Sequence, residues 1–470
     1  APASGTGTGV QPAELPFVLP TRDPAAPQPT PDAPHALPAL RTEEASYTIR
    51  AGDTLAEIAR AYQVPVQRVI DANAISDPNL ISPGQVLRIP PPTPDGSAPG
   101  FKLIPDAELV FSPTSALLDL NTYIASSGGY LSSYREEIGG ESYSGAQIVD
   151  LISRYFSVNP RLLLALIEYQ SGWLSNPNPG ETAKTYPLGW QDPSRKDLYR
   201  QLAWAANLLN RGYYLWKVNA IGTFTLPDGA ILRPDDTVNA GTAALQYLFS
   251  LLYDRAAFEK AVGPEGFFAQ FERMFGYPFD YTYEVIPAGL QQPPMMLPFQ
   301  SGESWSYTGG PHGGWGDGSA WAAIDFAPPG EGRGCAESDA WVTAVADGKI
   351  IRVDTGVVVL DLDTDGYEQT GWTVLYLHIA SKDRVALNAL VKAGDRIGHP
   401  SCEGGVSNGT HVHIARRYNG EWIAADGALP FNLDGWISAG YGEEYNGSLT
   451  RDGKLVEAWE FFTPANQISR

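Results

Sequence analysis

The chain has 470 residues and is acidic, with 53 Asp and Glu against 32 Lys and Arg and a net charge of −21. This charge argues against binding to nucleic acid or anionic lipid, because both need a basic surface. No run of about 18 apolar residues occurs, so we expect no transmembrane segment. The length exceeds the size of one hydrophobic core, and we expect about three domains.

Residues 1–45 are rich in Pro, Ala, Thr and Gly, and we interpret them as an extended, largely disordered tether. The chain begins Ala-Pro-Ala-Ser without a Met, as in a mature secreted protein whose signal peptide has been removed; a trimmed chain would look the same. We therefore expect an extracellular or cell-envelope location.

A compact strand–helix–helix–strand unit is predicted over residues 46–91. Leu55, Ile58 and Tyr62 recur at helical spacing, a second short helix is expected over residues 66–73, and a short strand lies at each end. A unit of this size forms a small βααβ domain.

Two stretches of this unit resemble a LysM domain: Tyr-Thr-Ile-Arg-Ala-Gly-Asp-Thr-Leu at 47–55 and Leu-Ile-Ser-Pro-Gly-Gln-Val-Leu-Arg-Ile-Pro at 80–90. The resemblance implies binding to glycans that contain N-acetylglucosamine, usually peptidoglycan, along two loops. The contacts that it implies come from Gly52, Asp53, Thr54, Leu55, Asn79, Leu80 and Ile81. Gly52 and Asp53 also fit a turn followed by a helix cap, whether or not a sugar binds.

A second linker is predicted over residues 92–112, because Pro is frequent between residues 90 and 100. Apolar residues then recur at helical spacing, and we predict an all-α domain over residues 113–285. Asn159 followed by Pro160 is typical of a helix start, and the helix that follows is Leu-rich and expected to be buried.

This helix, over residues 159–173, resembles the lysozyme-type transglycosylases, in which a helix ends in Glu-Ser-Gly-aromatic. Gln170 stands at the position of the catalytic Glu, and an amide cannot protonate a glycosidic oxygen. Glu168 lies on a different face of the helix and is a poor substitute. We therefore expect a degenerate lysozyme-like domain that binds sugar or that only separates the two ends of the chain.

Short alternating strands separated by Gly-rich turns predict a mostly antiparallel β domain over residues 286–470. Within it, His411 and His413 alternate with Val412 in a predicted strand and therefore point to the same face. Asp325 ends an apolar strand, where an unpaired carboxylate is costly. A His/Asp/His set with an open fourth position meets the requirement for catalytic zinc, although His-x-His strands also occur without a metal.

These residues resemble the zinc metallopeptidases of the lysostaphin and β-lytic endopeptidase superfamily. The common His-x-x-x-Asp pattern is missing, because Trp321 stands four residues before Asp325. The β-lytic branch separates the two ligands further, and the spacing from His312 to Asp325, 325 − 312 = 13, fits that branch. The resemblance implies zinc held by His312, Asp325 and His413, with His378 and His411 as the catalytic pair that does not bind the metal.

Three further features of this domain carry predictions. Tyr376, expected on the same strand face as His378, is a candidate oxyanion donor or a packed aromatic. The two cysteines, Cys335 and Cys402, are expected to form a disulfide in an exported protein, with two free thiols as the alternative. Residues 361–366 copy the first half of an EF-hand loop, but Trp372 replaces its bidentate Glu, so we expect a hairpin turn, with calcium as the alternative.

Together these features predict an exported bacterial cell-wall protein that hydrolyses peptide bonds in peptidoglycan stem peptides or cross-bridges. The LysM domain would raise the local concentration of substrate by tethering. Two other functions are alternatives: a non-catalytic wall-binding or envelope-assembly protein that retains the metallopeptidase fold, and a glycosidase that acts through Glu168.

Overall fold

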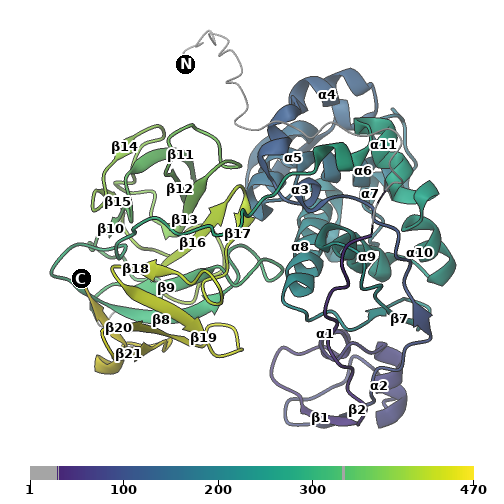
Figure 1. The fold of residues 1–470 in the computed structure, drawn as a ribbon, viewed down its shortest axis with the longest axis horizontal. Coiled ribbons are helices and arrows are strands. Elements are labelled where there is room, and N and C mark those ends of the chain that lie inside the picture. The colour runs from purple at the N-terminus through teal and green to yellow at the C-terminus, as the bar shows by residue number, and fades with distance from the viewer. Residues whose placement is uncertain (1–28, 30, 331–333) are drawn as a thin grey trace.

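The computed structural model describes residue 29 and residues 31–330 and 334–470 (Figure 1). Most of the predicted tether lies outside the described residues. Its described part lies along the helical region: the Asp32 amide donates to the Thr237 carbonyl at 2.9 Å, and the His35 ring stacks on Trp216 with centroids 4.5 Å apart. This part of the predicted tether is therefore packed rather than disordered, because it has specific partners.

The first unit has the predicted strand–helix–helix–strand order. Its elements are β1 (Ala45–Thr48), α1 (Leu55–Ala61), α2 (Val66–Asn73) and β2 (Val86–Ile89), with β1 and β2 antiparallel. Leu55, Ile58, Val69, Leu87 and Ile89 form a core of its own. The buried residues are therefore those that alternation along β2 and helical spacing along α1 predict.

The side chain of Gln63 joins this unit to the helical region. Gln63 Oε1 accepts hydrogen bonds from the Gly222 and Thr223 amides at 2.8 and 2.9 Å, and Gln63 Nε2 donates to the Ala220 carbonyl at 3.1 Å. Both lone pairs of Gln63 Oε1 therefore accept hydrogen bonds from the helical region. The first unit is therefore held against the helical region rather than attached by a linker alone.

The middle of the chain is mainly helical. Its helices are α3 (Asp106–Leu109), α4 (Leu120–Ser127), α5 (Gly145–Phe156), α6 (Pro160–Ser171), α7 (Glu181–Thr185), α8 (Asp197–Lys217), α9 (Ala240–Leu252), α10 (Arg255–Ala261) and α11 (Ala269–Phe275). Asn159 caps α6 by accepting from the Arg161 amide, as its sequence predicts. In the part of the chain that the structure describes, no helix is both long enough and apolar enough to cross a membrane.

The middle region is not purely helical, contrary to the prediction. It contains the hairpin β4 (Arg135–Ile138) and β5 (Glu141–Ser144), and a small sheet of β3 (Gly96–Ser97), β6 (Phe224–Thr225) and β7 (Ile231–Arg233). These strands are two to four residues long, so they leave little periodic signal.

Residues 92–112 are not a linker, and this prediction is also wrong. β3 pairs in parallel with β7, and Leu103, Ile104 and Leu109 are fully buried in the core of the helical region. The Pro-rich start of the segment is typical of a linker, although apolar residues follow it. The helical region therefore begins within this segment rather than after it.

The C-terminal region is built from antiparallel strands beside the helices (Figure 1). Its main sheet has the order β14 (Leu390–Val391), β11 (Gly348–Asp354), β12 (Gly356–Asp361), β13 (Trp372–Ile379), β16 (Val412–Tyr418), β9 (Ala323–Ala327), β8 (Ser304–His312) and β22 (Gln467–Ser469), with β17 (Glu421–Trp422) paired to β16. A second sheet contains β18 (Asn432–Leu433), β19 (Trp436–Gly440), β20 (Gly447–Arg451) and β21 (Lys454–Glu457), and β10 (Val342–Thr343) pairs with β15 (Arg396–Gly398).

The two faces of the main sheet have different partners. Leu377 pairs with His413 and His413 pairs with Asp325, so the three side chains lie on one face. Leu375, Ala415 and neighbouring residues of this face share a hydrophobic core with the helical region, whereas Tyr376, Ile414 and Ile324 pack on the other side. The helical region therefore covers part of the sheet face that carries His413 and Asp325.

Candidate metal centre

His312, Asp325 and His413 meet on three adjacent strands. His312 ends β8, Asp325 lies in β9 and His413 lies in β16, and all three side chains are buried. His312 Nε2 lies 3.2 Å from Asp325 Oδ1 and 2.9 Å from His413 Nδ1, and His413 Nδ1 lies 3.3 Å from Asp325 Oδ1. The strand order therefore gathers one oxygen and two nitrogen atoms from positions far apart in the chain.

Backbone carbonyls decide which ring nitrogens of this group carry protons. His312 Nδ1 lies 2.8 Å from the Gly310 carbonyl, and His413 Nε2 lies 3.2 Å from the Gly314 carbonyl. A carbonyl oxygen can only accept, so each of these nitrogens is the donor. The nitrogens that face Asp325 therefore present lone pairs in the neutral rings, which is the form that binds a metal.

The spacing of the three atoms fits a tetrahedral zinc site. Zn–N and Zn–O bonds of about 2.0–2.1 Å place tetrahedral ligand atoms about 3.3 Å apart, close to the three distances observed here. Asp325 Oδ1 is buried and receives no hydrogen bond from the described residues. The three residues thus fit a divalent metal, and one tetrahedral position remains for water or substrate.

Electrostatics also favours a cation at this place. Burial raises the pKa of Asp325, but His312 and His411 outweigh it and hold the pKa well below its ordinary value, so the carboxylate is charged. Burial lowers the pKa of His312, yet the Asp325 carboxylate outweighs burial and raises it. The cluster therefore draws in a positive charge, which either a proton on His312 or a metal ion can supply.

His378 and His411 lie beside this cluster. Their ring centroids are 4.5 Å apart, and His411 Nε2 lies 3.7 Å from Asp325 Oδ2. His378 Nδ1 donates to the Glu403 carbonyl at 2.9 Å and His411 Nδ1 to the Gly409 carbonyl at 2.8 Å. Burial and the neighbouring histidines lower the pKa of His378 to about 4. Because Nδ1 is the donor in each ring, Nε2 is the nitrogen that accepts a proton.

The backbone at His378 differs from the expected strand. Its φ of +64° lies in the left-handed region, and the ladder between β12 and β13 shifts register at this residue. The regular alternation ends there, so His378 comes close to His411 whereas Tyr376 points to the opposite core. Tyr376 Oη accepts from the Val345 amide at 2.8 Å, so the prediction that it shares a face with His378 is wrong and it is a packed aromatic.

Tyr445 belongs to the centre and was not predicted. Its ring stacks on His312 with centroids 4.2 Å apart, and it is half exposed on the loop between β19 and β20. Tyr445 is far from His312 in the sequence and lies in no motif. Only the approach of the second sheet to the end of β8 brings the two rings together.

The connection between β8 and β9 is held by the helical region, which also was not predicted. Trp315 stacks on Tyr155 of α5 with centroids 4.4 Å apart, and Arg211 of α8 lies 3.1 Å from the Asp317 carboxylate. The same connection carries Gly314, whose carbonyl accepts from His413. The helical region therefore supports one of the contacts that orient this histidine.

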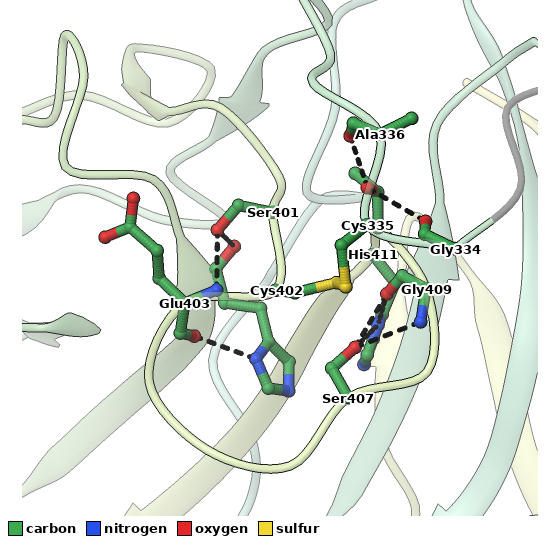
Figure 2. Close-up of a disulfide and its surroundings, with 11 residues drawn as sticks. Gly334, Cys335, Ala336, Ser401, Cys402, Glu403, Ser407, Gly409 and His411 are labelled. Atoms are coloured by element: carbon green, nitrogen blue, oxygen red, sulfur yellow. Dashed lines mark hydrogen bonds between the residues drawn. A yellow bond between two sulfur atoms is a disulfide. The ribbon is translucent and has the colours of Figure 1, made fainter.

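The predicted disulfide between Cys335 and Cys402 is confirmed, with Cα atoms 5.6 Å apart (Figure 2). The predicted hairpin turn at residues 361–366 also forms, between β12 and β13. Asp361 closes the turn by accepting from the amides of Asp363, Thr364 and Gly366 at 3.2, 3.3 and 2.9 Å. Asp361, Asp363 and Asp365 lie close enough together to hold a metal ion, so calcium stays the alternative.

The residues predicted to contact glycan lie in two neighbouring loops. The Ile49 carbonyl accepts from the Gly84 amide at 2.8 Å and thereby joins the loop of Gly52, Asp53, Thr54 and Leu55 to that of Asn79, Leu80 and Ile81. Thr54 caps α1, and Asp53 accepts from the Arg50 amide at 2.7 Å. Leu55 is buried, whereas Leu80 is 77% exposed and free to contact a ligand.

Glu168 and Gln170 have structural contacts in the helical region. Glu168 accepts from the Leu174 and Ser175 amides at 2.9 and 3.2 Å, and it also accepts from the Ser175 hydroxyl. Gln170 Oε1 accepts from the Tyr253 hydroxyl at 2.7 Å. Glu168 therefore closes the turn after α6, which argues against its use as a catalytic acid.

Two regions of the chain match known protein families. Residues 47–90 match the family model described as "LysM domain", and residues 102–288 match the one described as "LasA, N-terminal domain". The second match begins inside the segment that the sequence predicts as a linker. The lysozyme-like character of the middle region stays a prediction.

Protease LasA of Pseudomonas aeruginosa is 27% identical over 345 residues, which are 69% of this chain and 75% of that protein. The N-acetylmuramoyl-L-alanine amidase XlyA of Bacillus subtilis is 33% identical over 124 residues, which are 24% of this chain and 39% of that protein. A solved structure titled as a novel M23 metalloprotease, pseudoalterin, from the deep sea is 24% identical and covers 39% of this chain and 100% of its own, with a TM-score of 0.30.

Proposed function

We propose that this chain, which combines a LysM domain with a metallopeptidase domain of the lysostaphin and β-lytic type, is an extracellular or cell-envelope zinc endopeptidase of a bacterium. Its substrate would be the peptide bonds of peptidoglycan stem peptides or cross-bridges. The observation that carries the proposal is the convergence of His312, Asp325 and His413, with ring tautomers that turn two nitrogen lone pairs toward one carboxylate oxygen.

His312 Nε2, His413 Nδ1 and Asp325 Oδ1 would hold zinc. Zinc bound there would lower the pKa of a water molecule and polarise the scissile carbonyl. The chain itself supplies the proton transfers. His411 Nε2 and His378 Nε2 are both acceptors beside the cluster, so one ring can take the proton from water and then give it to the leaving amine. The other ring, protonated from solvent, can donate to the developing oxyanion.

The LysM domain would hold the enzyme on its substrate through the loops of residues 52–55 and 79–81. Gln63 fixes this domain against the helical region, and the helical region in turn packs on the sheet of the metal centre. Glycan binding would therefore place the metal centre at a restricted distance from the bound strand rather than at the end of a free tether. This restriction would limit which peptides the centre can reach.

The decisive test is digestion of purified peptidoglycan by the full chain, with and without a zinc chelator, followed by mass spectrometry of the products. We expect new peptide amino termini that disappear with the chelator and return with added zinc. The matched variant is His411→Ala, which keeps the three proposed ligands and should lose the activity. Retention on intact peptidoglycan without cleavage would favour a wall-binding protein, and new reducing or anhydro-sugar ends would move the chemistry to the helical region.

A further inference from the structure

The residues on both sides of Cys402 hold His378. The Ser401 amide and hydroxyl donate to the His378 carbonyl at 2.7 and 3.0 Å, and the Glu403 carbonyl accepts from His378 Nδ1 at 2.9 Å. These three bonds fix both the backbone and the ring of His378. Its left-handed backbone is unfavourable in a residue other than glycine, and such a conformation persists only where its surroundings impose it.

The two segments that the Cys335–Cys402 disulfide joins also support the start of the strand at His411. The His411 amide donates to the Ser401 carbonyl at 3.3 Å. Thr410, one residue earlier, donates through its amide to the Gly334 carbonyl at 3.0 Å and through its hydroxyl to the Ala336 carbonyl at 2.5 Å. Figure 2 shows the segment of Gly334, Cys335 and Ala336 joined through the disulfide to Ser401, Cys402 and Glu403, with His411 nearby.

The proposed metal ligands do not depend on this arrangement. His312, Asp325 and His413 are held by the ladder of β8, β9 and β16 and by the carbonyls of Gly310 and Gly314. Among the described residues, none of the hydrogen bonds of these three side chains involves residues 334–336 or 401–403. Loss of the disulfide should therefore loosen the catalytic pair and leave the metal in place.

We propose that the Cys335–Cys402 disulfide is the positioning element of the His378 and His411 pair, so that the enzyme reaches its full rate only in its oxidised form. This inference rests on the proposed function, because it assigns the disulfide a role in that reaction. The bond closes a loop across 67 residues of sequence, and without it both flanking segments regain conformational freedom. The chain would then be slow in a reducing compartment and fully active outside the cell.

The test compares the oxidised, zinc-loaded full chain with the same protein reduced by a water-soluble trialkylphosphine, which avoids the zinc binding of dithiols. Phosphorus gives two electrons to the disulfide and takes the oxygen of water, whose two protons end on the two thiols. We expect kcat on peptidoglycan to fall about 10- to 100-fold, the cost of misplacing a catalytic group by about 1 Å. KM, zinc content after desalting and the far-ultraviolet circular dichroism should stay unchanged, and reoxidation should restore the rate.

Two variants serve as controls. The double variant Cys335→Ala/Cys402→Ala should have the low kcat of the reduced protein and should not respond to the phosphine, which separates reduction from any side effect. Ser401→Ala keeps the disulfide and removes one of the bonds to the His378 carbonyl, so it should lower kcat by a smaller factor. If the double variant does not fold, reduction and reoxidation of the folded chain decide the question.

The outcomes separate this inference from the proposed function. No cleavage by the oxidised protein would overturn the proposed function, and this inference with it. Cleavage at equal rates by the oxidised and reduced proteins would overturn this inference alone. Loss of zinc or of folded structure on reduction would also overturn it, since the disulfide would then be a general cross-link. A fall in kcat with zinc retained would support it.

Discussion

Replacement of Glu368 by Gln tests how the helical region is joined to the metal-bearing sheet. Glu368 is buried between β12 and β13, where its carboxylate lies 2.8 Å from Arg352 Nε and 2.7 Å from an Arg417 guanidinium nitrogen. Arg154 of α5 approaches the same carboxylate at 3.5 Å. One charged group therefore links two strands of the sheet to a helix of the neighbouring region.

The size of the effect follows from the pKa of Glu368. Burial raises this pKa, but Arg352, Arg417 and Arg154 outweigh burial and lower it from 4.5 to about 2. The difference of roughly 2.5 corresponds to about 3 kcal/mol, at about 1.4 kcal/mol for each pKa unit. Because the pKa is lower in the folded protein, this stability is fully present above pH 4.5 and is lost as the pH falls from there toward 2.

The assay is urea unfolding of Glu368→Gln and of the unchanged chain at pH 7 and at pH 3. We expect Glu368→Gln to lower the free energy of unfolding of the C-terminal region by about 3 kcal/mol at pH 7 and by clearly less at pH 3. The matched control is Glu460→Gln, a change at an exposed carboxylate that should alter the free energy by less than about 0.5 kcal/mol. An equal loss at both pH values would refute the reasoning, because it would come from packing rather than from charge.

Three other substitutions test the remaining contacts. Asp325→Asn should release bound zinc and slow peptidoglycan cleavage. The loss should exceed the ~10- to 100-fold loss that follows when a residue hydrogen-bonded to a metal ligand is removed. Zinc content and cleavage rate measure this, and full zinc retention would contradict it. Gln63→Ala removes three hydrogen bonds worth about 1 kcal/mol each and should speed amide exchange at Gly222 and Thr223; unchanged exchange would show that other contacts hold the LysM domain. Leu80→Asp should weaken retention on peptidoglycan about tenfold, whereas Val86→Asp, an exposed change on β2 outside both loops, should not; equal loss in both would contradict a loop site.

The local pattern of the sequence was sufficient for some of these features. Alternation in a strand turns His411 and His413 to one face, because successive residues of a strand point in opposite directions. A carboxylate after the apolar run 322–324 marks Asp325, since a buried charge needs partners, although the strand continues past it to Ala327. Helical spacing and turn residues likewise predict both helices of the LysM domain. Each of these signals lies within about ten residues of chain.

Contacts between distant segments decided the rest. His378 reaches His411 because its backbone leaves the strand conformation, and the bonds that impose this come from Ser401 and Glu403. Tyr445 meets His312 through the approach of a second sheet. Residues 92–112 are buried because a helical core accepts them. Local periodicity reports the backbone of one segment, whereas the rotation of a side chain and the burial of a loop depend on partners that only the folded chain brings near.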